Sequence, residues 1–214
     1  MKIFLDSANL DAIRRAKELG LLDGITTNPT LVAKEKMPAD ELYEEILKLC
    51  EGPINVEAVS ADADGIVAEA RRFFGRDERF VTKIPCGVEG LKAVRRLTDE
   101  GVPTNVTLVF SPLQALLAAK AGAHYVSPFI GRLDDISQPG MALIADIVEI
   151  YDNYDFDTEI VVASVRNPVH VLDAAKMGAD IVTIPPAVIE QLIKHPLTDI
   201  GVQRFMEDYA KIPK

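Results

Sequence analysis

The chain contains the stretch Arg79-Phe80-Val81-Thr82-Lys83-Ile84-Pro85-Cys86-Gly87, an apolar run with one lysine in its middle. Residues 80–84 favour a β-strand, because β-branched and aromatic residues cluster there and a Pro-Cys-Gly turn follows at once. Parallel strands are buried on both faces, so Lys83 is expected either in helix packing or inside a barrel. Desolvation lowers the pKa of a lysine and makes its amine a nucleophile suited to Schiff-base chemistry. The alternative is a lysine that extends into solvent at a strand end.

Length and charge narrow the class of protein and its partners. A chain of 214 residues can bury one full core, so one domain is expected. The formal net charge is -10 and no block of Lys and Arg occurs, which argues against nucleic acid or a membrane as a partner. Only three consecutive apolar residues, Ile3 to Leu5, stand before Asp6, so no targeting segment is expected, and no stretch approaches about 18 uninterrupted apolar residues. We therefore expect a soluble, cytoplasmic protein.

Cysteine and histidine give no sign of a metal centre. Cys50 and Cys86 lack metal-ligand spacing and are expected as reduced thiols. The histidines, His124, His170 and His195, are scattered along the sequence and form no cluster with Asp or Glu. A metal-dependent aldolase is therefore disfavoured, and no metal or other cofactor is expected.

Short apolar runs alternate with segments of helical spacing along the whole chain. Two of the runs, 122–129 and 178–185, share a pattern in which Gly-Ala leads into a strand that ends in a hydroxyl. Helices are predicted at 9–19, 38–50, 62–74, 87–100, 140–151 and 168–177, and another begins at Ser111-Pro112. The predicted strands are 2–6, 23–29, 54–59, 80–84, 103–109, 122–129, 159–164 and 178–185.

This alternation predicts an α/β protein with a single (β/α)8 TIM barrel over residues 1–194, with its chemistry at the C-terminal strand ends. A doubly wound open sheet is the main rival fold, but it needs a glycine loop such as G-x-G-x-x-G, which the sequence lacks. Residues 195–214 exceed the eight units. Their apolar residues predict a C-terminal helical extension that packs on the barrel or on a neighbouring subunit.

Polar residues gather where the predicted strands end. Glu57 is notable because a carboxylate inside an apolar strand is rare unless it is paired, although its partner could simply be Lys83. Asp6 could equally cap a helix. Arg132 and Arg166 suggest a phosphate clamp, because the guanidinium fork matches phosphate, although each could instead form a surface ion pair. The remaining polar residues at these positions are Thr26, Asn28, Asn105, Thr107, Ser127 and Ser164.

Together these segments resemble the short transaldolase family, the sibling of the fructose-6-phosphate aldolases. The resemblance covers essentially the whole chain, with Ser7 where many relatives carry threonine. It implies a lysine-dependent barrel without metal, assembled as pentameric rings or decamers in which the C-terminal helix reaches a neighbour. The segments that carry it are Phe4-Leu5-Asp6-Ser7-Ala8-Asn9, Gly24-Ile25-Thr26-Thr27-Asn28-Pro29-Thr30, Asn55-Val56-Glu57, Val81-Thr82-Lys83-Ile84-Pro85, Asn105-Val106-Thr107, Ser127-Pro128-Phe129-Ile130-Gly131-Arg132 and Ala163-Ser164-Val165-Arg166.

The resemblance also implies a reaction in the pentose phosphate pathway. Lys83 would form a Schiff base with sedoheptulose 7-phosphate or fructose 6-phosphate, and Asp6 would take the proton of the hydroxyl on carbon 4. The dihydroxyacetone unit left on Lys83 would pass to glyceraldehyde 3-phosphate or erythrose 4-phosphate. Glu57 and Thr107 would hold a water molecule that relays protons.

Substrate contacts follow from the same resemblance. Asn28 and Asn105 would hold the dihydroxyacetone hydroxyls, Thr26 and Ser127 would line the site, and Arg132, Ser164 and Arg166 would receive the phosphate. Glu57 and Phe129 favour transfer, because the resembling aldolases carry glutamine and tyrosine there. The alternatives are an aldolase that releases free dihydroxyacetone and a barrel that binds sugar phosphates without turnover.

Overall fold

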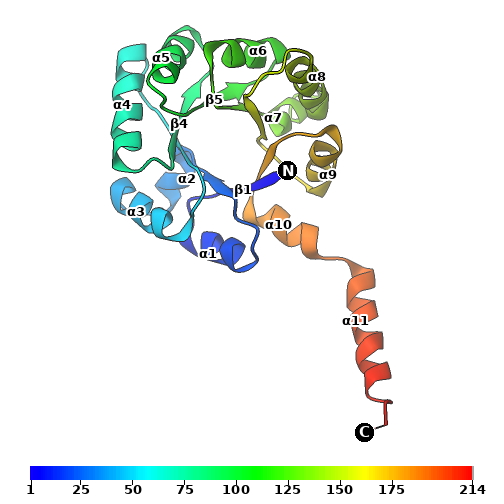
Figure 1. Ribbon diagram of the computed structural model, residues 1–214. Coiled ribbons are helices and arrows are strands. Elements are labelled where there is room, and N and C mark those ends of the chain that lie inside the picture. Colours follow the sequence, from blue (N-terminus) through cyan, green and yellow to red (C-terminus); the bar gives the residue numbers. More distant parts are fainter. Residues whose placement is uncertain (214) are drawn as a thin grey trace.

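The structure is a computed structural model that describes residues 1–213. Eight parallel strands form one closed barrel in sequence order, and β8 pairs with β1 to close it (Figure 1). The predicted (β/α)8 barrel is therefore confirmed. The strands are β1 Lys2–Asp6, β2 Gly24–Thr26, β3 Ile54–Glu57, β4 Phe80–Pro85, β5 Thr104–Val109, β6 Tyr125–Pro128, β7 Glu159–Val162 and β8 Ile181–Ile184.

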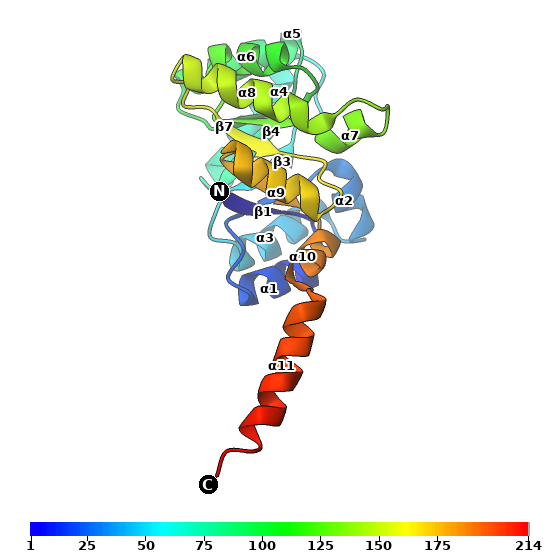
Figure 2. The ribbon, with the colours of Figure 1, turned by 90° about the vertical axis from the view of Figure 1, so that its right-hand side faces the viewer.

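Helices form the outer layer around this barrel (Figures 1 and 2). Two of them, α2 and α7, are short and follow β2 and β6 directly; the sequence pattern does not predict α7. The helices are α1 Leu10–Glu18, α2 Pro29–Lys34, α3 Ala39–Leu49, α4 Ala63–Arg76, α5 Val88–Asp99, α6 Pro112–Ala121, α7 Ile130–Asp134, α8 Gly140–Asn153, α9 Pro168–Met177, α10 Pro186–Ile193 and α11 Pro196–Tyr209.

Strands β2, β3 and β7 end two or more residues earlier than predicted, and β2 and β7 each have a visible local reason. β2 stops at Thr26 because Asn28 caps α2, accepting a hydrogen bond from the backbone N–H of Leu31 at 3.0 Å. β7 stops at Val162, and Ser164 lies in the left-handed region with φ +62°. Both breaks occur at the C-terminal end of the barrel, where they turn polar side chains away from regular strand geometry.

Apolar side chains fill the part of the barrel interior that is farther from the C-terminal strand ends, and this cluster is called the plug below. Phe4 and Tyr125 meet edge to face, with ring centroids 6.3 Å apart. A Cβ at Gly24 would collide with the Phe4 ring, so the absence of a side chain there makes room for the plug. The plug consists of Phe4, Val81, Tyr125, Val161 and Ile181, all buried. Because side chains alternate along each strand, the next inward positions on these strands lie above the plug, toward the C-terminal end.

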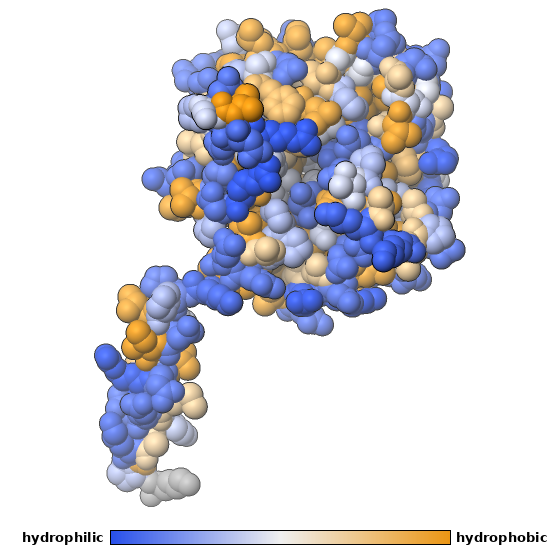
Figure 3. All heavy atoms as spheres, turned by 180° about the vertical axis from the view of Figure 1, so that it is seen from behind, coloured by the Kyte–Doolittle hydropathy of each residue, from blue (hydrophilic) through white to orange (hydrophobic). Residues whose placement is uncertain are grey.

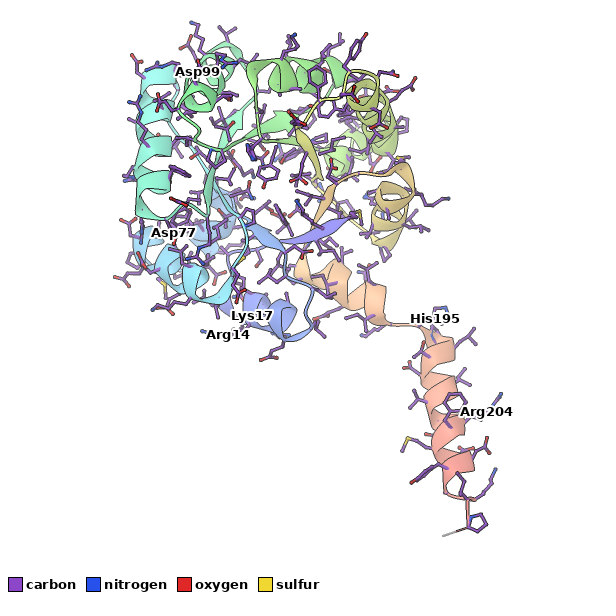
Figure 4. The ribbon with its side chains drawn as sticks, in the orientation of Figure 1. Arg14, Lys17, Asp77, Asp99, His195 and Arg204 are labelled. Carbon is purple, nitrogen blue, oxygen red and sulfur yellow. The ribbon has the colours of Figure 1, made fainter. Side chains whose placement is uncertain are left out.

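Helix α11 extends away from the barrel, and none of its residues is buried (Figures 1 and 2). Figure 4 places His195 at its start and Arg204 along it, both remote from the barrel interior. Apolar groups are exposed on this helix (Figure 3). Lys214, the last residue of the predicted extension, lies outside the described residues. The exposed apolar side chains of α11 are Leu197, Ile200, Val202, Phe205, Met206 and Tyr209.

Among residues 1–213, every helix is too short or too polar to span a bilayer.

Candidate active site

A cavity of about 220 Å³ opens at the C-terminal ends of the barrel strands. Most of the predicted site residues line it. The exceptions are Glu57, Asn105 and Thr107, which lie behind or beside its wall. The wall is formed by Asp6, Thr26, Asn28, Lys83, Ser127, Phe129, Arg132, Ala163, Ser164, Val165, Arg166, Thr183 and Pro185.

Strand β4 directs Lys83 into the barrel. Phe80 faces outward, packing edge to face on Tyr43 of α3 with centroids 5.8 Å apart, whereas Val81 belongs to the interior plug. Alternation therefore places Lys83 inward, one layer above Val81. It is only 4% exposed, and its Nζ donates a hydrogen bond to the carbonyl oxygen of Thr27 at 3.0 Å. A lysine that extends into solvent is thus excluded, and the amine is available only to a molecule inside the cavity.

Glu57 is the closest carboxylate to this amine. Its Oε2 lies 3.5 Å from Lys83 Nζ, because strands β3 and β4 are in register at these two residues. The Glu57 side chain is 17% exposed and lines a second cavity, of about 420 Å³, between α2, α3 and α4. Glu57 therefore pairs with Lys83 on one side and reaches water on the other. The ion pair with Lys83 that is the structural alternative for Glu57 is therefore present.

Asp6 faces the same cavity from the end of β1. Burial raises the pKa of its carboxyl, and this effect outweighs the opposing influence of the Lys83 charge and of a hydrogen bond from Thr26. The Thr26 hydroxyl donates to Asp6 Oδ1 at 2.9 Å. A carboxyl whose pKa is raised by burial is better suited to take up a proton and return it. The same side chain does not cap α1, because Asn9 fills that position.

A buried polar network lies beneath the cavity. Ser127 Oγ donates to Asn105 Oδ1 at 2.8 Å, and Asn105 Nδ2 donates to Asn55 Oδ1 at 2.9 Å. Asn55 Nδ2 in turn donates to the carbonyl oxygen of Ile25 at 3.1 Å. All three side chains are essentially inaccessible to solvent. Asn105 therefore supports Ser127 from behind, whereas Ser127 itself forms part of the cavity wall.

Strand β5 is irregular where it carries Thr107. Its register with β6 shifts between Val106 and Val109, and Leu108 has φ +56°. Such a bulge re-aims the side chains next to it. The Thr107 hydroxyl is buried and has no hydrogen-bond partner among residues 1–213. A buried hydroxyl without a partner is unfavourable, so this atom is available to a small polar guest such as water.

Two arginines, Arg132 and Arg166, belong to the cavity wall. The Arg132 guanidinium lies over the ring of Phe129, 5.0 Å from its centroid. Arg166 pairs with Asp135, with Nη2 and Oδ2 3.0 Å apart, and both of these side chains are more than half exposed. Gly131 lets α7 approach the loop after β7, because a Cβ there would collide with the Ser164 carbonyl and the Arg166 side chain. The two guanidinium groups thus reach the same cavity from different elements.

Comparison with known proteins identifies the group to which this barrel belongs. The Transaldolase/Fructose-6-phosphate aldolase family matches residues 3–214. The chain belongs to this family. A probable transaldolase of Aquifex aeolicus (strain VF5) is 60% identical over 214 residues, which cover 100% of this chain and 99% of that protein. One of Anaeromyxobacter sp. (strain Fw109-5) is also 60% identical, with both chains covered in full.

Structural comparison gives the same architecture at a greater distance. A mandelate oxidase mutant that carries a monooxide FMN adduct superposes with a TM-score of 0.56 at 14% identity. The match covers 86% of this chain and 63% of the oxidase. At this identity the likeness shows the barrel fold alone.

Membership of the transaldolase/aldolase family was expected from the sequence. Several residues that line the cavity were not predicted as site residues. Thr183 lines the wall, and its hydroxyl lies 2.6 Å from that of Thr26. The only sequence signal for it is the hydroxyl that ends the eighth predicted strand. Asn55, for which the sequence suggested no role, lies behind the wall and joins Asn105 to the backbone of β2. Among residues 1–213, no group of three or more His, Cys, Asp or Glu side chains is placed to hold a metal ion.

Proposed function

We propose that this transaldolase-family chain transfers a dihydroxyacetone unit from a ketose phosphate to an aldose phosphate through a Schiff base on Lys83. The observation that carries the proposal is the buried Lys83 amine at the cavity, with Asp6 and Glu57 close by on other strands. The full-length relatives named probable transaldolases support transfer over release. The proposed donor is sedoheptulose 7-phosphate or fructose 6-phosphate, and the proposed acceptor is glyceraldehyde 3-phosphate or erythrose 4-phosphate.

The reaction begins at the ketone. The Lys83 amine attacks the carbonyl carbon, and loss of water gives a protonated Schiff base. Asp6 then takes the proton of the hydroxyl on carbon 4 while the bond between carbons 3 and 4 breaks. The electron pair of that bond enters the Schiff base as an enamine, and the aldose phosphate leaves. The enamine next attacks the acceptor aldehyde, Asp6 returns its proton to the new hydroxyl, and water releases the product ketose.

Glu57 and Thr107 are proposed to hold the water that relays protons during Schiff-base formation. Glu57 lies 3.5 Å from the amine and opens to the second cavity, and the Thr107 hydroxyl lacks a partner among the described residues. A carboxylate at position 57 can act as a general base there. Asn28 and Ser127, which line the cavity, are proposed to hold the dihydroxyacetone hydroxyls, with Asn105 supporting Ser127.

The substrate phosphate is proposed to bind Arg132, Ser164 and Arg166. These residues line the cavity, and two guanidinium groups supply charge-assisted donors. Arg166 would exchange its exposed pairing with Asp135 for the phosphate. An exposed ion pair contributes only about 0.2 to 1 kcal/mol, so this exchange is not costly.

We also infer a homo-oligomer made from one barrel domain per chain and the extension that begins at residue 195. Helix α11 exposes Phe205, Met206 and Tyr209, with no barrel surface of its own chain against them. Apolar side chains on one projecting helix favour burial against another copy. Sedimentation of the full chain tests this, because a monomer at micromolar concentration would contradict it.

Borohydride trapping tests the chemistry directly. Incubation with fructose 6-phosphate and borohydride is expected to attach the sugar carbon skeleton to Lys83, and peptide mass spectrometry locates the adduct. A chain that binds sugar phosphates without turnover gives no adduct. A coupled assay with and without erythrose 4-phosphate then separates transfer from release. Cleavage that is equally fast without the acceptor would mean that the chain is an aldolase.

Phe129→Tyr combined with Glu57→Gln is expected to raise acceptor-independent release of dihydroxyacetone by at least about tenfold relative to transfer. Phe129 lines the cavity, and its ring has no donor to protonate the enamine, whereas a tyrosine hydroxyl there can donate through water. The measurement is fructose 6-phosphate cleavage with and without acceptor. Phe110→Tyr is the matched control, since Phe110 packs on Phe129 with centroids 5.9 Å apart but does not line the cavity. An unchanged ratio in the double variant would show that these positions do not select transfer.

A further inference from the structure

The barrel interior contains a chain of hydroxyls that ends on Asp6. The Thr183 hydroxyl on β8 lies 2.6 Å from the Thr26 hydroxyl on β2, and Thr26 donates to Asp6 Oδ1 at 2.9 Å. Both threonines are 2% exposed, and both line the cavity. Strand β1 lies between β8 and β2 in the barrel, so the hydroxyl contact spans the strand that carries Asp6. This arrangement joins three strands at one point of the site.

The charge of Asp6 determines the direction of this chain. An ionised carboxylate can only accept hydrogen bonds, and a hydroxyl has one proton to donate. Because Thr26 gives its proton to Asp6, it must accept from Thr183. Both O–H dipoles then point toward the carboxylate, and each strengthens the other. Thr183 is therefore the donor that polarises the Thr26 hydrogen bond.

We propose that Thr183 is a positioning residue that acts through Thr26 to hold Asp6 as a proton-accepting carboxylate. The proposal rests on the function proposed above, in which Asp6 is the base. Thr183 needs no contact with the reacting carbons for this role. While Asp6 is ionised, the Thr183 hydroxyl dipole points toward the carboxylate from a buried position, where such dipoles have large effects.

The same chain also suits the protonated state of Asp6. After carbon–carbon cleavage the proton from the substrate hydroxyl resides on Asp6, which can then donate to Thr26. Thr26 rotates to donate to Thr183, and the Thr183 proton turns toward the cavity. No proton leaves the chain, and every hydroxyl keeps a partner. A valine at position 183 would remove the hydrogen bond between residue 183 and Thr26 in both states of Asp6. The loss of stabilisation is greater in the ionised state, because hydrogen bonds to charged groups are stronger.

Other charged groups face Asp6 and must be held constant in a test. Lys83 and the two arginines, Arg132 and Arg166, line the same cavity, and Glu57 lies behind Lys83. The Lys83 charge favours the ionised form of Asp6, while burial disfavours it. None of these groups changes in a Thr183 variant. The acidic limb of the kcat/KM profile is the pH range in which kcat/KM falls as Asp6 becomes protonated. A shift of this limb in a Thr183 variant is therefore assigned to the hydroxyl chain.

The decisive measurement is the pH dependence of kcat/KM for Thr183→Val. The acidic limb is expected to move to higher pH, lowering kcat/KM about tenfold on that limb, which corresponds to about 1.4 kcal/mol. At higher pH the variant should approach wild type, which a general structural defect would not allow. Thr183→Ser keeps the hydroxyl and should recover the wild-type limb. Thr104→Val is the matched control, since the Thr104 hydroxyl on β5 is buried without a partner among residues 1–213.

The possible outcomes separate this inference from the proposed function. If Thr183→Val keeps the wild-type limb, or if Thr183→Ser loses as much as Thr183→Val, the hydroxyl chain has no role. Should Thr183→Val not fold, Thr183→Ala is measured against Thr183→Ser with the same two criteria. Asp6→Asn is run in parallel. If Asp6→Asn remains active, the assignment of the base is wrong; if it is inactive while the limb of Thr183→Val is unchanged, only the inference about Thr183 is overturned.

Discussion

Lys83→Met is expected to lower the rate of dihydroxyacetone transfer by about 10⁴-fold or more, as loss of a covalent nucleophile does in other enzymes. Lys83 is the one lysine in the cavity wall, and it is 4% exposed, so no other amine of the wall can form the Schiff base. Methionine has a similar length and needs no partner. The measurement is kcat for transfer from fructose 6-phosphate, together with loss of the borohydride adduct.

The fold of this variant should survive. Removal of one partner of a fully buried ion pair is strongly destabilising, but the Glu57 side chain is 17% exposed and reaches the second cavity. The melting temperature of Lys83→Met should therefore remain close to that of wild type. Lys92→Met is the matched control: this exposed lysine of α5 pairs with Glu89 and does not line the cavity. Substantial transfer by folded Lys83→Met would refute the Schiff-base mechanism.

Local sequence placed Lys83 in a buried strand but left open whether it faces the helices or the barrel interior, and the structure decides this. A strand of alternating inward and outward residues, with Phe80 packing on helices, leaves Lys83 only the barrel interior. The C-terminal strand ends meet at one rim in any parallel barrel. For this reason Asp6, Lys83 and Ser127, which are distant in sequence, could be placed at the same end of the barrel before the structure was known.

What the sequence could not predict depends on contacts between distant strands and on loop geometry. Thr107 was expected from the family resemblance to hold a relay water with Glu57, and the bulge at Leu108 and the register shift that direct this part of β5 could not be predicted from the sequence. For Asn105 the family resemblance implied a substrate contact, whereas its hydrogen bonds to Ser127 and Asn55 depend on contacts between strands that the sequence does not show. The role of Thr183 depends on β8 closing beside β1, a contact that no local pattern encodes.

The arginines illustrate the same limit. Arg166 was predicted either to bind phosphate or to form a surface pair, and it both lines the cavity and pairs with Asp135, 31 residues away. Asp135 follows α7, the short helix that the sequence pattern does not predict. The ion pair is exposed, so it is weak enough to yield to a phosphate.

Arg132→Ala combined with Arg166→Ala is expected to raise KM for fructose 6-phosphate by about 10² to 10⁴, since each charge-assisted hydrogen bond contributes about 1.5 to 3 kcal/mol. Transfer from an unphosphorylated ketose should change little, because its contacts lie at Lys83 and Asp6. The measurement is KM and kcat for the phosphorylated and unphosphorylated donors side by side. Equal losses for both donors would mean that the arginines stabilise the cavity instead of binding phosphate.

Two further variants distinguish phosphate binding from ring stacking and from the ion pair. Arg72 lies over Phe73 at 4.9 Å, nearly the geometry of Arg132 over Phe129, but it is outside the candidate cavity. Arg72→Ala should therefore leave both KM values unchanged. Asp135→Asn should act in the opposite direction to the arginine variants and lower KM for the phosphorylated donor by about two- to fivefold, because Arg166 is then free of its exposed partner. An increase in KM for Asp135→Asn would show that Asp135 holds Arg166 in place for the phosphate instead of competing with it.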